Sequence, residues 1–327
     1  MKGYESSTAK PPLVSILIPC HNAASWLAAT LESALGQTHA PLEILVVDDG
    51  SIDDSAAIAR SFASRCVQVV AQPNRGASAA RNAAFRQSHG DFIQFLDADD
   101  LLAPEKIERQ MGLLAAAPAG CIAAGPWGRF ERNPAAAIFT AEDNWRDCDP
   151  VEWLALNFSG RGMMPPAAWL VPRTLVESAG PWDERLTLND DGEYFCRILL
   201  ASSGIRFCPD ARTFYRSNLA GSLSGRRSEA AWRSAFLSHE LCANHLLARE
   251  DSARTRRACA DLFQRLAFAM HPDCPALVNR CETEAGRHGG SALQSGGGLL
   301  FQLLVHVFGW KTARRWQRCR QSATSRS

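Results

Sequence analysis

The 327-residue sequence lacks any apolar run that could cross a membrane. A membrane-spanning helix needs roughly 18 to 20 consecutive apolar residues. The first apolar run, residues 13–20, is too short, and Lys2, Glu5 and Lys10 precede it. A secretory signal is therefore not expected, and we expect the protein to be cytoplasmic.

The sequence also lacks an excess of charge of one sign. Lys and Arg number 35 and Asp and Glu number 34, so the net charge is +1. A protein that binds nucleic acid over its whole surface is normally strongly basic, so we expect no nucleic-acid partner, although a local basic patch stays possible. Hydrophobic residues make up 46% and charged residues 21%, as in a folded protein.

Several short motifs are missing as well. The 11 cysteines include no CxxC pair, which favours reduced thiols over a zinc framework. The metalloprotease motif HExxH, the phosphate-binding motif GxxxxGK[ST] and the dinucleotide motif GxGxxG are absent. The last absence excludes a Rossmann-type dehydrogenase.

The first hundred residues show strands alternating with helices. Short apolar runs predict strands at residues 13–19, 42–47, 67–71 and 91–96. Pro19 should end the first strand, and Asn22 or Ser25 should cap the helix after it. Helices of about ten residues, such as 77–87, separate the strands, which predicts an α/β fold with a mostly parallel, doubly wound sheet. Ligands bind such sheets beyond the carboxyl ends of the strands.

Acidic clusters stand at two of these strand ends. Asp48 and Asp49 could accept hydrogen bonds from a base or a ribose, although an ordinary turn is the better explanation from these residues alone. Asp97 and Asp99 could hold Mg²⁺ or Mn²⁺ through oxygen ligands. Alternatively, the acids mark the start of a helix from Leu101, which would explain Asp100 but explains Asp97 poorly.

A third feature lies between these clusters. Gly76 and small residues begin the helix at 77–87, and Arg75 and Arg81 flank them. Free N–H groups at a helix start suit an anion, although glycine at such a junction is common for backbone reasons alone.

The order of the motifs is more specific than any one of them. They are SILIPCHN at 15–22, VVDDGSID at 46–53, NRGASAARN at 74–82, FLDADD at 95–100, GPWDE at 180–184 and DDGEYFCR at 190–197. The ordered set resembles the family 2 glycosyltransferases of the GT-A fold, and the resemblance covers residues 13–225. It implies transfer of a sugar from a nucleotide-sugar donor with inversion at the anomeric carbon.

The resemblance implies roles in donor binding for several residues. Asp49 matches the residue that hydrogen-bonds the uracil of the donor, and Pro19 and Asn22 match residues that line the same pocket. Arg81 matches an arginine near the base. The donor implied is a UDP-sugar.

The resemblance also implies a metal site and a base. Asp97 matches the carboxylate of the ribose or metal shell, and Asp99 matches the direct ligand of Mn²⁺ or Mg²⁺. Asp191, six residues before Arg197, matches the general base. Without the resemblance, a capped helix start would be the better explanation of Asp190 and Asp191.

The sequence departs from the family at two places. Asn218 stands where a histidine near the metal or diphosphate is frequent, and asparagine cannot change its charge at neutral pH. Asp190 replaces a common glutamate, which is a mild change.

We divide the chain into a flexible N-terminus (1–12), a glycosyltransferase domain (13–225) and a helical C-terminal extension (226–327). The domain comprises a nucleotide-sugar half (13–102) and an acceptor half (103–225). In the acceptor half, tryptophans could line an acceptor cleft, but core packing is the better explanation for most of them. The extension contains a Gly-rich linker at 286–298.

The end of the extension, residues 299–320, is apolar and then basic. This pattern favours a helix on a membrane surface and, equally, a helix docked on protein. Contact with the inner face of the cytoplasmic membrane would suit a lipid-linked acceptor, and a saccharide is the other acceptor that we expect.

The sequence thus predicts a metal-assisted inverting glycosyltransferase that acts in polysaccharide or glycolipid synthesis. One alternative is a non-catalytic nucleotide-sugar binding module, against which the intact Asp97, Asp99 and Asp191 argue. A nucleotidyltransferase ranks lower, because a Gly-rich loop with Lys or Arg should then follow the first strand.

Overall fold

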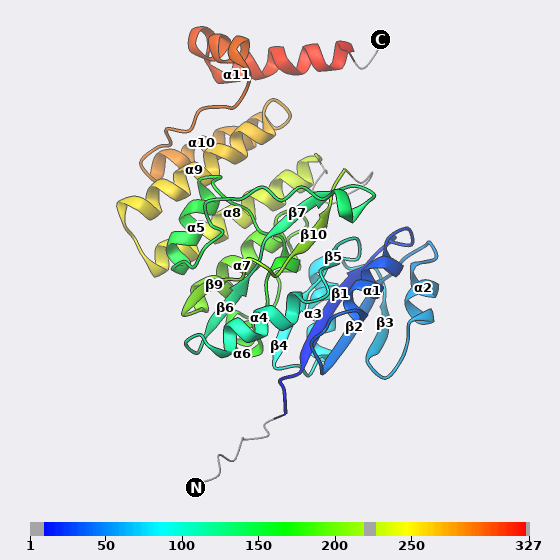
Figure 1. The fold of residues 1–327 in the computed structure, drawn as a ribbon. Helices are drawn as coiled ribbons and strands as arrows, with labels where there is room; N and C mark the ends of the chain where they lie inside the picture. The colour runs from blue at the N-terminus through cyan, green and yellow to red at the C-terminus, as the bar shows by residue number, and fades with distance from the viewer. Residues whose placement is uncertain (1–9, 219–226, 325–327) are drawn as a thin grey trace.

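The main sheet has five strands in the order β3-β2-β1-β4-β8 (Figure 1). The computed structural model describes residues 10–218 and 227–324, with the backbone alone for 299, 300 and 318–324. The first four strands are parallel, and β8 runs antiparallel to β4. The bounds are β1 Val14–Cys20, β2 Leu42–Asp49, β3 Val67–Gln72, β4 Phe92–Phe95 and β8 Val171–Pro172. The predicted mostly parallel sheet is confirmed.

The buried character of β1 explains its place near the middle of the sheet. All seven of its residues are buried, and successive side chains point to opposite faces. Ile16 and Ile18 pack in the core beneath α1 (Leu27–Leu35) and α2 (Ser55–Ser61). Leu17 packs on the other face with the alanines of α3 (Ala77–Gln87). The acidic ends of β2 and β4 therefore lie at one edge of a sheet covered on both faces.

Two smaller sheets extend the fold. One has the order β5-β10-β7, and the other pairs β6 with β9. The bounds are β5 Leu101–Leu102, β6 Cys121–Ala124, β7 Trp127–Phe130, β9 Gly204–Phe207 and β10 Thr213–Arg216. The expectation of a helix from Leu101 is wrong, since Leu101 and Leu102 pair with β10 and the next helix, α4, is Lys106–Ala115.

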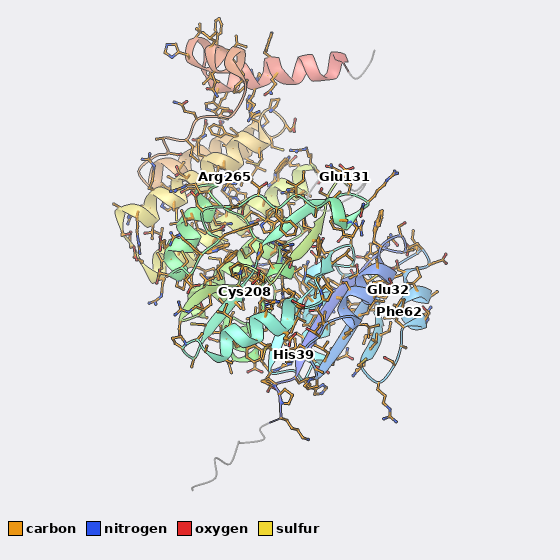
Figure 2. The ribbon with its side chains drawn as sticks, viewed as in Figure 1. Glu32, His39, Phe62, Glu131, Cys208 and Arg265 are labelled. Atoms are coloured by element: carbon orange, nitrogen blue, oxygen red, sulfur yellow. The ribbon has the colours of Figure 1, made fainter. Side chains whose placement is uncertain are left out.

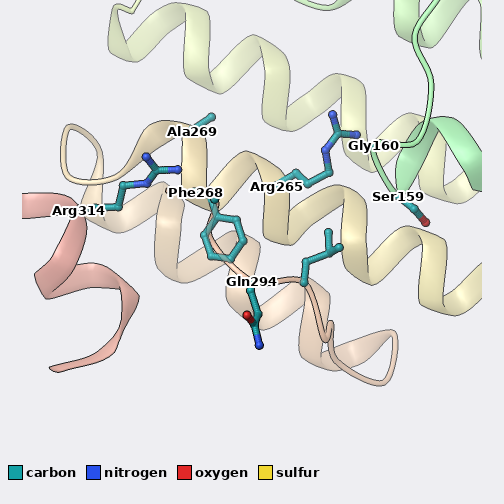
Figure 3. A pocket seen from close by; sticks show the side chains of 9 residues that line it. Ser159, Gly160, Arg265, Phe268, Ala269, Gln294 and Arg314 are labelled. Atoms are coloured by element: carbon teal, nitrogen blue, oxygen red, sulfur yellow. The ribbon is translucent and has the colours of Figure 1, made fainter. Parts of the chain in front are cut away.

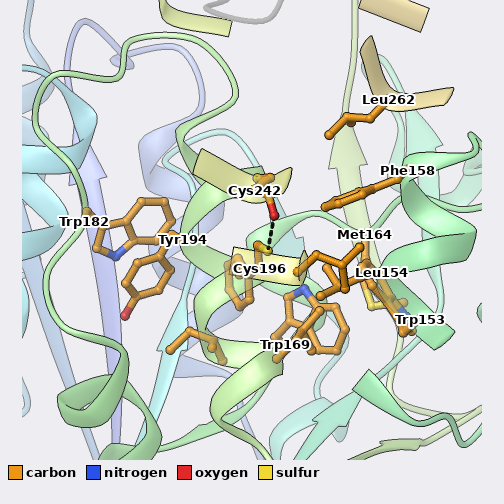
Figure 4. Close-up of a cluster of buried hydrophobic side chains, with 14 of the residues drawn as sticks. Trp153, Leu154, Phe158, Met164, Trp169, Trp182, Tyr194, Cys196, Cys242 and Leu262 are labelled. Atoms are coloured by element: carbon orange, nitrogen blue, oxygen red, sulfur yellow. Dashed lines mark hydrogen bonds between the residues drawn. The ribbon is translucent and has the colours of Figure 1, made fainter. Parts of the chain in front are cut away.

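The middle of the chain carries three helices and two short 3₁₀ turns over a second core. They are η1 Pro134–Ala136, α5 Pro150–Phe158, η2 Pro166–Ala168, α6 Arg173–Ala179 and α7 Asp190–Ala201. Trp153 and Trp169 meet edge to face in this core, with ring centroids 5.2 Å apart (Figure 4). Trp127, Trp153 and Trp169 are all buried, so core packing explains them, as expected.

Four helices form the C-terminal part: α8 Glu229–Arg249, α9 Ala253–Met270, α10 Pro275–Arg287 and α11 Leu299–Thr324. Helix α8 packs on α7, and the Cys196 thiol donates a hydrogen bond to the Cys242 carbonyl (3.8 Å, Figure 4). Side chains of α8, α9 and α10 share one core with those of the sheet. The helical extension is confirmed.

Some predicted boundaries differ from the structure. The first residues of the predicted linker belong to α10, which ends at Arg287, so the loop is 288–298. Neither Asn22 nor Ser25 caps α1, because the residue before the helix is Trp26 and no side chain caps it. Residues 1–9 of the predicted flexible N-terminus and the domain boundary near 225 lie outside the described residues.

Candidate functional site

The end of β1 is joined to the loop that follows β2. Pro19 is buried in β1 opposite Val47. Asn22 has a left-handed backbone (φ 51°), and its Oδ1 accepts a hydrogen bond from the Ile52 amide (2.9 Å). The Ser51 hydroxyl in turn accepts from the Asn22 amide (3.0 Å). These bonds bring the predicted pocket residues Pro19 and Asn22 to the carboxyl end of the sheet.

The Asp49 carboxylate fixes the loop between β3 and α3. Its Oδ1 accepts hydrogen bonds from the Gln72 side chain (2.7 Å) and the Arg75 amide (2.9 Å), and its Oδ2 accepts from the Gly76 amide (2.8 Å). Gly76 has φ 91°, which favours glycine. Asp49 is therefore buried and shapes this loop, in addition to any contact that it makes with a donor.

Arg81 on α3 joins the two acidic regions of the site. Its Nη2 donates to Asp97 Oδ1 (2.7 Å), and its Nη1 donates to Asp190 Oδ2 (2.9 Å). Only 6% of the Arg81 side chain is exposed. Although burial alone lowers the pKa of Arg81, Asp97 and Asp190 raise it above its ordinary value. The same guanidinium thus holds the end of β4 against the start of α7.

The Arg81 guanidinium packs on a pair of stacked aromatic rings. The guanidinium carbon lies 4.4 Å from the ring centroid of Trp182, which fits a cation–π contact. Trp182 stacks on Tyr194 of α7 with centroids 3.9 Å apart, and Figure 4 shows the two rings face to face. The Asn82 side chain accepts from the Trp182 amide and donates to its carbonyl (2.8 and 2.9 Å). The loop at 180–184 is therefore fixed to α3.

Helix α7 starts with the predicted base. Asn189 precedes it with φ 60°, and its side chain donates to the Ser238 hydroxyl of α8 (2.7 Å). Asp191 lies in the first turn and is half-buried. Burial, and then the neighbouring Asp190, raise the pKa of Asp191 to about 6. A carboxylate with this pKa can accept a proton near neutral pH.

Arg197 secures the same helix one turn later. Its Nε and Nη2 donate to Oε1 and Oε2 of Glu193 (2.7 and 2.8 Å). Its Nη1 bonds the Ala179 carbonyl, and its Nη2 donates to the Pro181 carbonyl (2.9 Å). Burial raises the pKa of Glu193, but hydrogen bonds from His245 and Arg197 lower it below its ordinary value. Arg197 therefore positions the helix that carries Asp191.

The end of β4 carries the aspartates predicted to hold a cation. The side chains of Asp97 and Asp99 are partly exposed, whereas Asp100 is buried. Arg216 of β10 donates from Nε to the Asp99 carbonyl (2.9 Å) and from its amide to Asp100 Oδ1 (2.8 Å). Strand β10 thus fixes the backbone of the 97–100 turn, and Asp100 has a structural role instead of starting a helix.

Known protein families share sequence with the part of the chain that carries this site. Residues 15–166 match the sequence model of the family described as Glycosyl transferase family 2. Residues 15–166 thus form a glycosyltransferase family 2 domain.

Relatives of this domain include an uncharacterized glycosyltransferase of Rickettsia typhi, 28% identical over 193 residues, which are 59% of this chain and 60% of the relative. A chondroitin synthase of Escherichia coli is 41% identical over 107 residues, which are 32% of this chain and 16% of that protein. The chain thus spans less than two thirds of the length of these relatives.

The fold of most of the chain matches a crystal structure of S. aureus TarS, residues 1–349, in complex with UDP-GlcNAc. The TM-score is 0.61 at 14% identity, and the match covers 85% of this chain and 89% of that one. The likeness confirms the predicted GT-A fold.

The aspartates of the glycosyltransferase domain fit a divalent cation. Burial, and then the nearby Asp97, raise the pKa of Asp99 to about 6, and a bound cation would favour its ionised form. Asp99, with Asp97 beside it, would hold Mn²⁺ or Mg²⁺, and the ion would stabilise negative charge on a diphosphate. No cluster of three or more metal-ligating side chains occurs in the described chain, so donor oxygens and water would complete the shell.

The departure at Asn218 has a local explanation. Asn218 has a left-handed backbone (φ 61°), and its side-chain amide donates to Glu131 Oε1 in the loop after β7. Glu131 is exposed, and Figure 2 labels it. The asparagine therefore closes the end of β10 onto a neighbouring loop.

Two residues to which the sequence alone gives no role organise the candidate site. Asp190 is a direct partner of Arg81. Arg216 holds the 97–100 turn. Each has its partner more than 100 residues away, so no local pattern could reveal these roles.

Proposed function

We propose that this protein transfers a sugar from a UDP-sugar to an acceptor hydroxyl, with inversion, in a single displacement. Asp191 accepts the proton of the attacking hydroxyl. Asp99 and Asp97 would hold the Mn²⁺ or Mg²⁺ ion beside the departing diphosphate. A single displacement forms no covalent intermediate on the enzyme, so no serine or cysteine nucleophile is required.

The contact of one guanidinium with both acidic regions carries this proposal. Arg81 bonds Asp97, two residues before the proposed metal ligand Asp99, and also Asp190, the neighbour of the proposed base. The residues proposed to act on the leaving diphosphate and the residue proposed to act on the acceptor are thus linked through Arg81. An inverting displacement needs them on opposite sides of a single sugar ring.

Binding of the nucleotide is proposed for the adjoining strand ends. Pro19, Asn22 and Asp49 lie around the ends of β1 and β2, and their loops are joined by hydrogen bonds. TarS, which shares the fold, is seen with UDP-GlcNAc. This supports a uridine nucleotide as the donor. Arg81 would act on the donor mainly through Asp97, because its side chain is buried.

The acceptor proposed is a saccharide or a lipid-linked hydroxyl compound. The chondroitin synthase among the relatives supports a role in making a polysaccharide. We place the protein in the cytoplasm, in the synthesis of a cell-envelope polysaccharide or a glycolipid.

Two linked measurements test this function. A thermal-shift panel of nucleoside diphosphates and nucleotide sugars, with and without Mn²⁺, should show a rise in Tm with uridine nucleotides, because a ligand of the folded state stabilises it. The responding sugar nucleotide is then incubated with acceptor saccharides, and the anomeric configuration of the product is read by NMR. No response to any uridine nucleotide would overturn the donor assignment, and binding without turnover of any acceptor would favour a non-catalytic module.

A further inference from the structure

Helix α11 is divided into two segments by a bend at Gly309. Gly309 has φ 75° and ψ 158°, which interrupts the helix between residues 308 and 310. A positive φ of this size favours glycine over other residues. In Figure 1 the helix changes direction at the end of the molecule farthest from the N-terminus. The two segments therefore point in different directions.

The segment after the bend is docked on the body of the protein. Trp310 meets Phe268 and His271 edge to face, with centroids 4.8 and 5.1 Å apart. The Lys311 ammonium lies 2.6 Å from Glu282 of α10, and Ala313 is buried. These contacts confirm that part of the helix packs on protein.

The segment before the bend is only partly covered. Phe301 is buried, and the Gln302 side chain donates to the Ser295 carbonyl (3.0 Å). By contrast, Leu303, Val307 and Phe308 are each 62% exposed. With the half-buried Leu304, these residues form two adjacent pairs that stand one helical turn apart, so they make one apolar stripe along the helix. We call Leu303, Leu304, Val307 and Phe308 the apolar stripe.

Basic residues follow the apolar stripe without any acid. Residues 299–324 contain no Asp or Glu, and Arg314, Arg315, Arg318 and Arg320 follow Lys311. Arg315 is exposed. Near the docked segment, Arg265 and Arg314 line a pocket of about 360 Å³ together with Phe268 and Gln294 (Figure 3). No acidic residue lines this pocket, so the only formal charges on its lining are positive.

We propose that the apolar stripe inserts into the surface of an anionic membrane, with the exposed Arg315 on the lipid phosphates. An exposed apolar stripe next to basic residues is the pattern of an interfacial helix. No described helix is long and apolar enough to cross a membrane, which fits a helix that lies on it. The basic residues that follow the stripe complement the negative charge of anionic lipid, which favours lipid over a second copy of the same basic segment as the occupant.

Vesicle sedimentation of the full chain tests the proposal without any nucleotide, so the result is independent of the proposed enzymatic function. The protein should bind vesicles that contain phosphatidylglycerol, bind purely phosphatidylcholine vesicles at least about tenfold less, and be released at high salt. Val307→Ser with Phe308→Ser, and separately Arg315→Glu, should each reduce binding about tenfold. Ile138→Ser, at a residue 71% exposed, is the matched control and should bind as wild type.

Thermal denaturation shows whether the variants fold, and Arg315→Glu tests the proposal independently of the stripe. Failure of the folded wild-type chain to bind anionic vesicles would overturn the proposal, as would unchanged binding by both variants. A dimer in light scattering that the Val307 and Phe308 substitutions dissociate would also overturn it, because the stripe would then be an interface between copies.

Discussion

Arg81 and Asp190 stand 109 positions apart in the chain and meet with Nη1 and Oδ2 separated by 2.9 Å. Because Nη2 of the same arginine bonds Asp97, the end of β4 and the start of α7 cannot move apart without unpairing a buried cation. The bridge thus sets the spacing between the proposed cation ligands and the proposed base, and the stack of Arg81 on Trp182 fixes the plane of the guanidinium.

Replacement of Arg81 should therefore weaken the fold as well as the site. Arg81→Gln removes the cation and leaves two carboxylates facing each other, which should cost about 3 kcal/mol of unfolding free energy. Urea denaturation followed by circular dichroism measures it. Arg233→Gln breaks the exposed pair with Glu229 and should cost less than about 1 kcal/mol. Equal losses in the two variants would contradict the bridging role.

Removal of the proposed base should separate chemistry from binding. Asp191→Asn keeps the shape but cannot accept the proton, so kcat should fall by about 10²- to 10⁴-fold. The Kd for UDP-sugar, measured by calorimetry, should stay within about twofold of wild type, because the proposed base would contact the acceptor and not the nucleotide. Asp210→Asn, at an exposed carboxylate, serves as the control. Full turnover by the Asp191 variant would remove the assignment.

The rate should depend on pH through the same carboxylate. Burial raises the pKa of Asp191 to about 6 with the help of Asp190. The ionised form accepts the proton, so kcat/KM should be level above this value and fall about tenfold for each pH unit below it. Initial rates between pH 5 and 8, with enzyme stability checked at each pH, measure the profile. A profile that stays flat down to pH 5 would show that Asp191 is not the base.

Loss of the proposed metal ligand should act on donor binding. Asp99→Asn removes one negative charge and a strong oxygen ligand. The affinity for UDP in the presence of Mn²⁺ should fall at least about tenfold, while the metal-free affinity should change little. Titration of UDP with and without Mn²⁺ gives both values. Mn²⁺ that strengthens UDP binding equally in the variant and the wild type would place the ion elsewhere.

Much of the fold could be predicted because its strands are short, buried and rich in β-branched residues. Helix α3 has the predicted bounds, Ala77–Gln87, since its small residues fit a helix packed on a sheet. The start of α1 could not be predicted, because hydrogen bonds from a distant loop organise it. The Ser55 hydroxyl accepts from the Ala23 amide (2.8 Å), and the Asp53 carboxylate accepts from the Ala24 amide (3.1 Å). Likewise, Leu101 and Leu102 form a strand only because β10 lies beside them.

The candidate site could be predicted in part. The order of the motifs marked the acids at 97, 99 and 191, and the structure brings the segments that carry them to one place through Arg81. Asp190 and Arg216 could not be found, because their roles depend on partners that only the folded chain brings near.

The packing of α8 against α7 has a consequence for any shortened form of the protein. The Ser238 hydroxyl donates to the Asn189 carbonyl (2.8 Å), and the Cys242 thiol donates to the Gly192 carbonyl (3.6 Å). These two bonds flank Asp191 along the chain. A truncation that ends before α8 would remove these contacts from the first turn of α7, which carries the proposed base Asp191. A segment that the sequence presents as a C-terminal extension is, in three dimensions, part of the support of the proposed base.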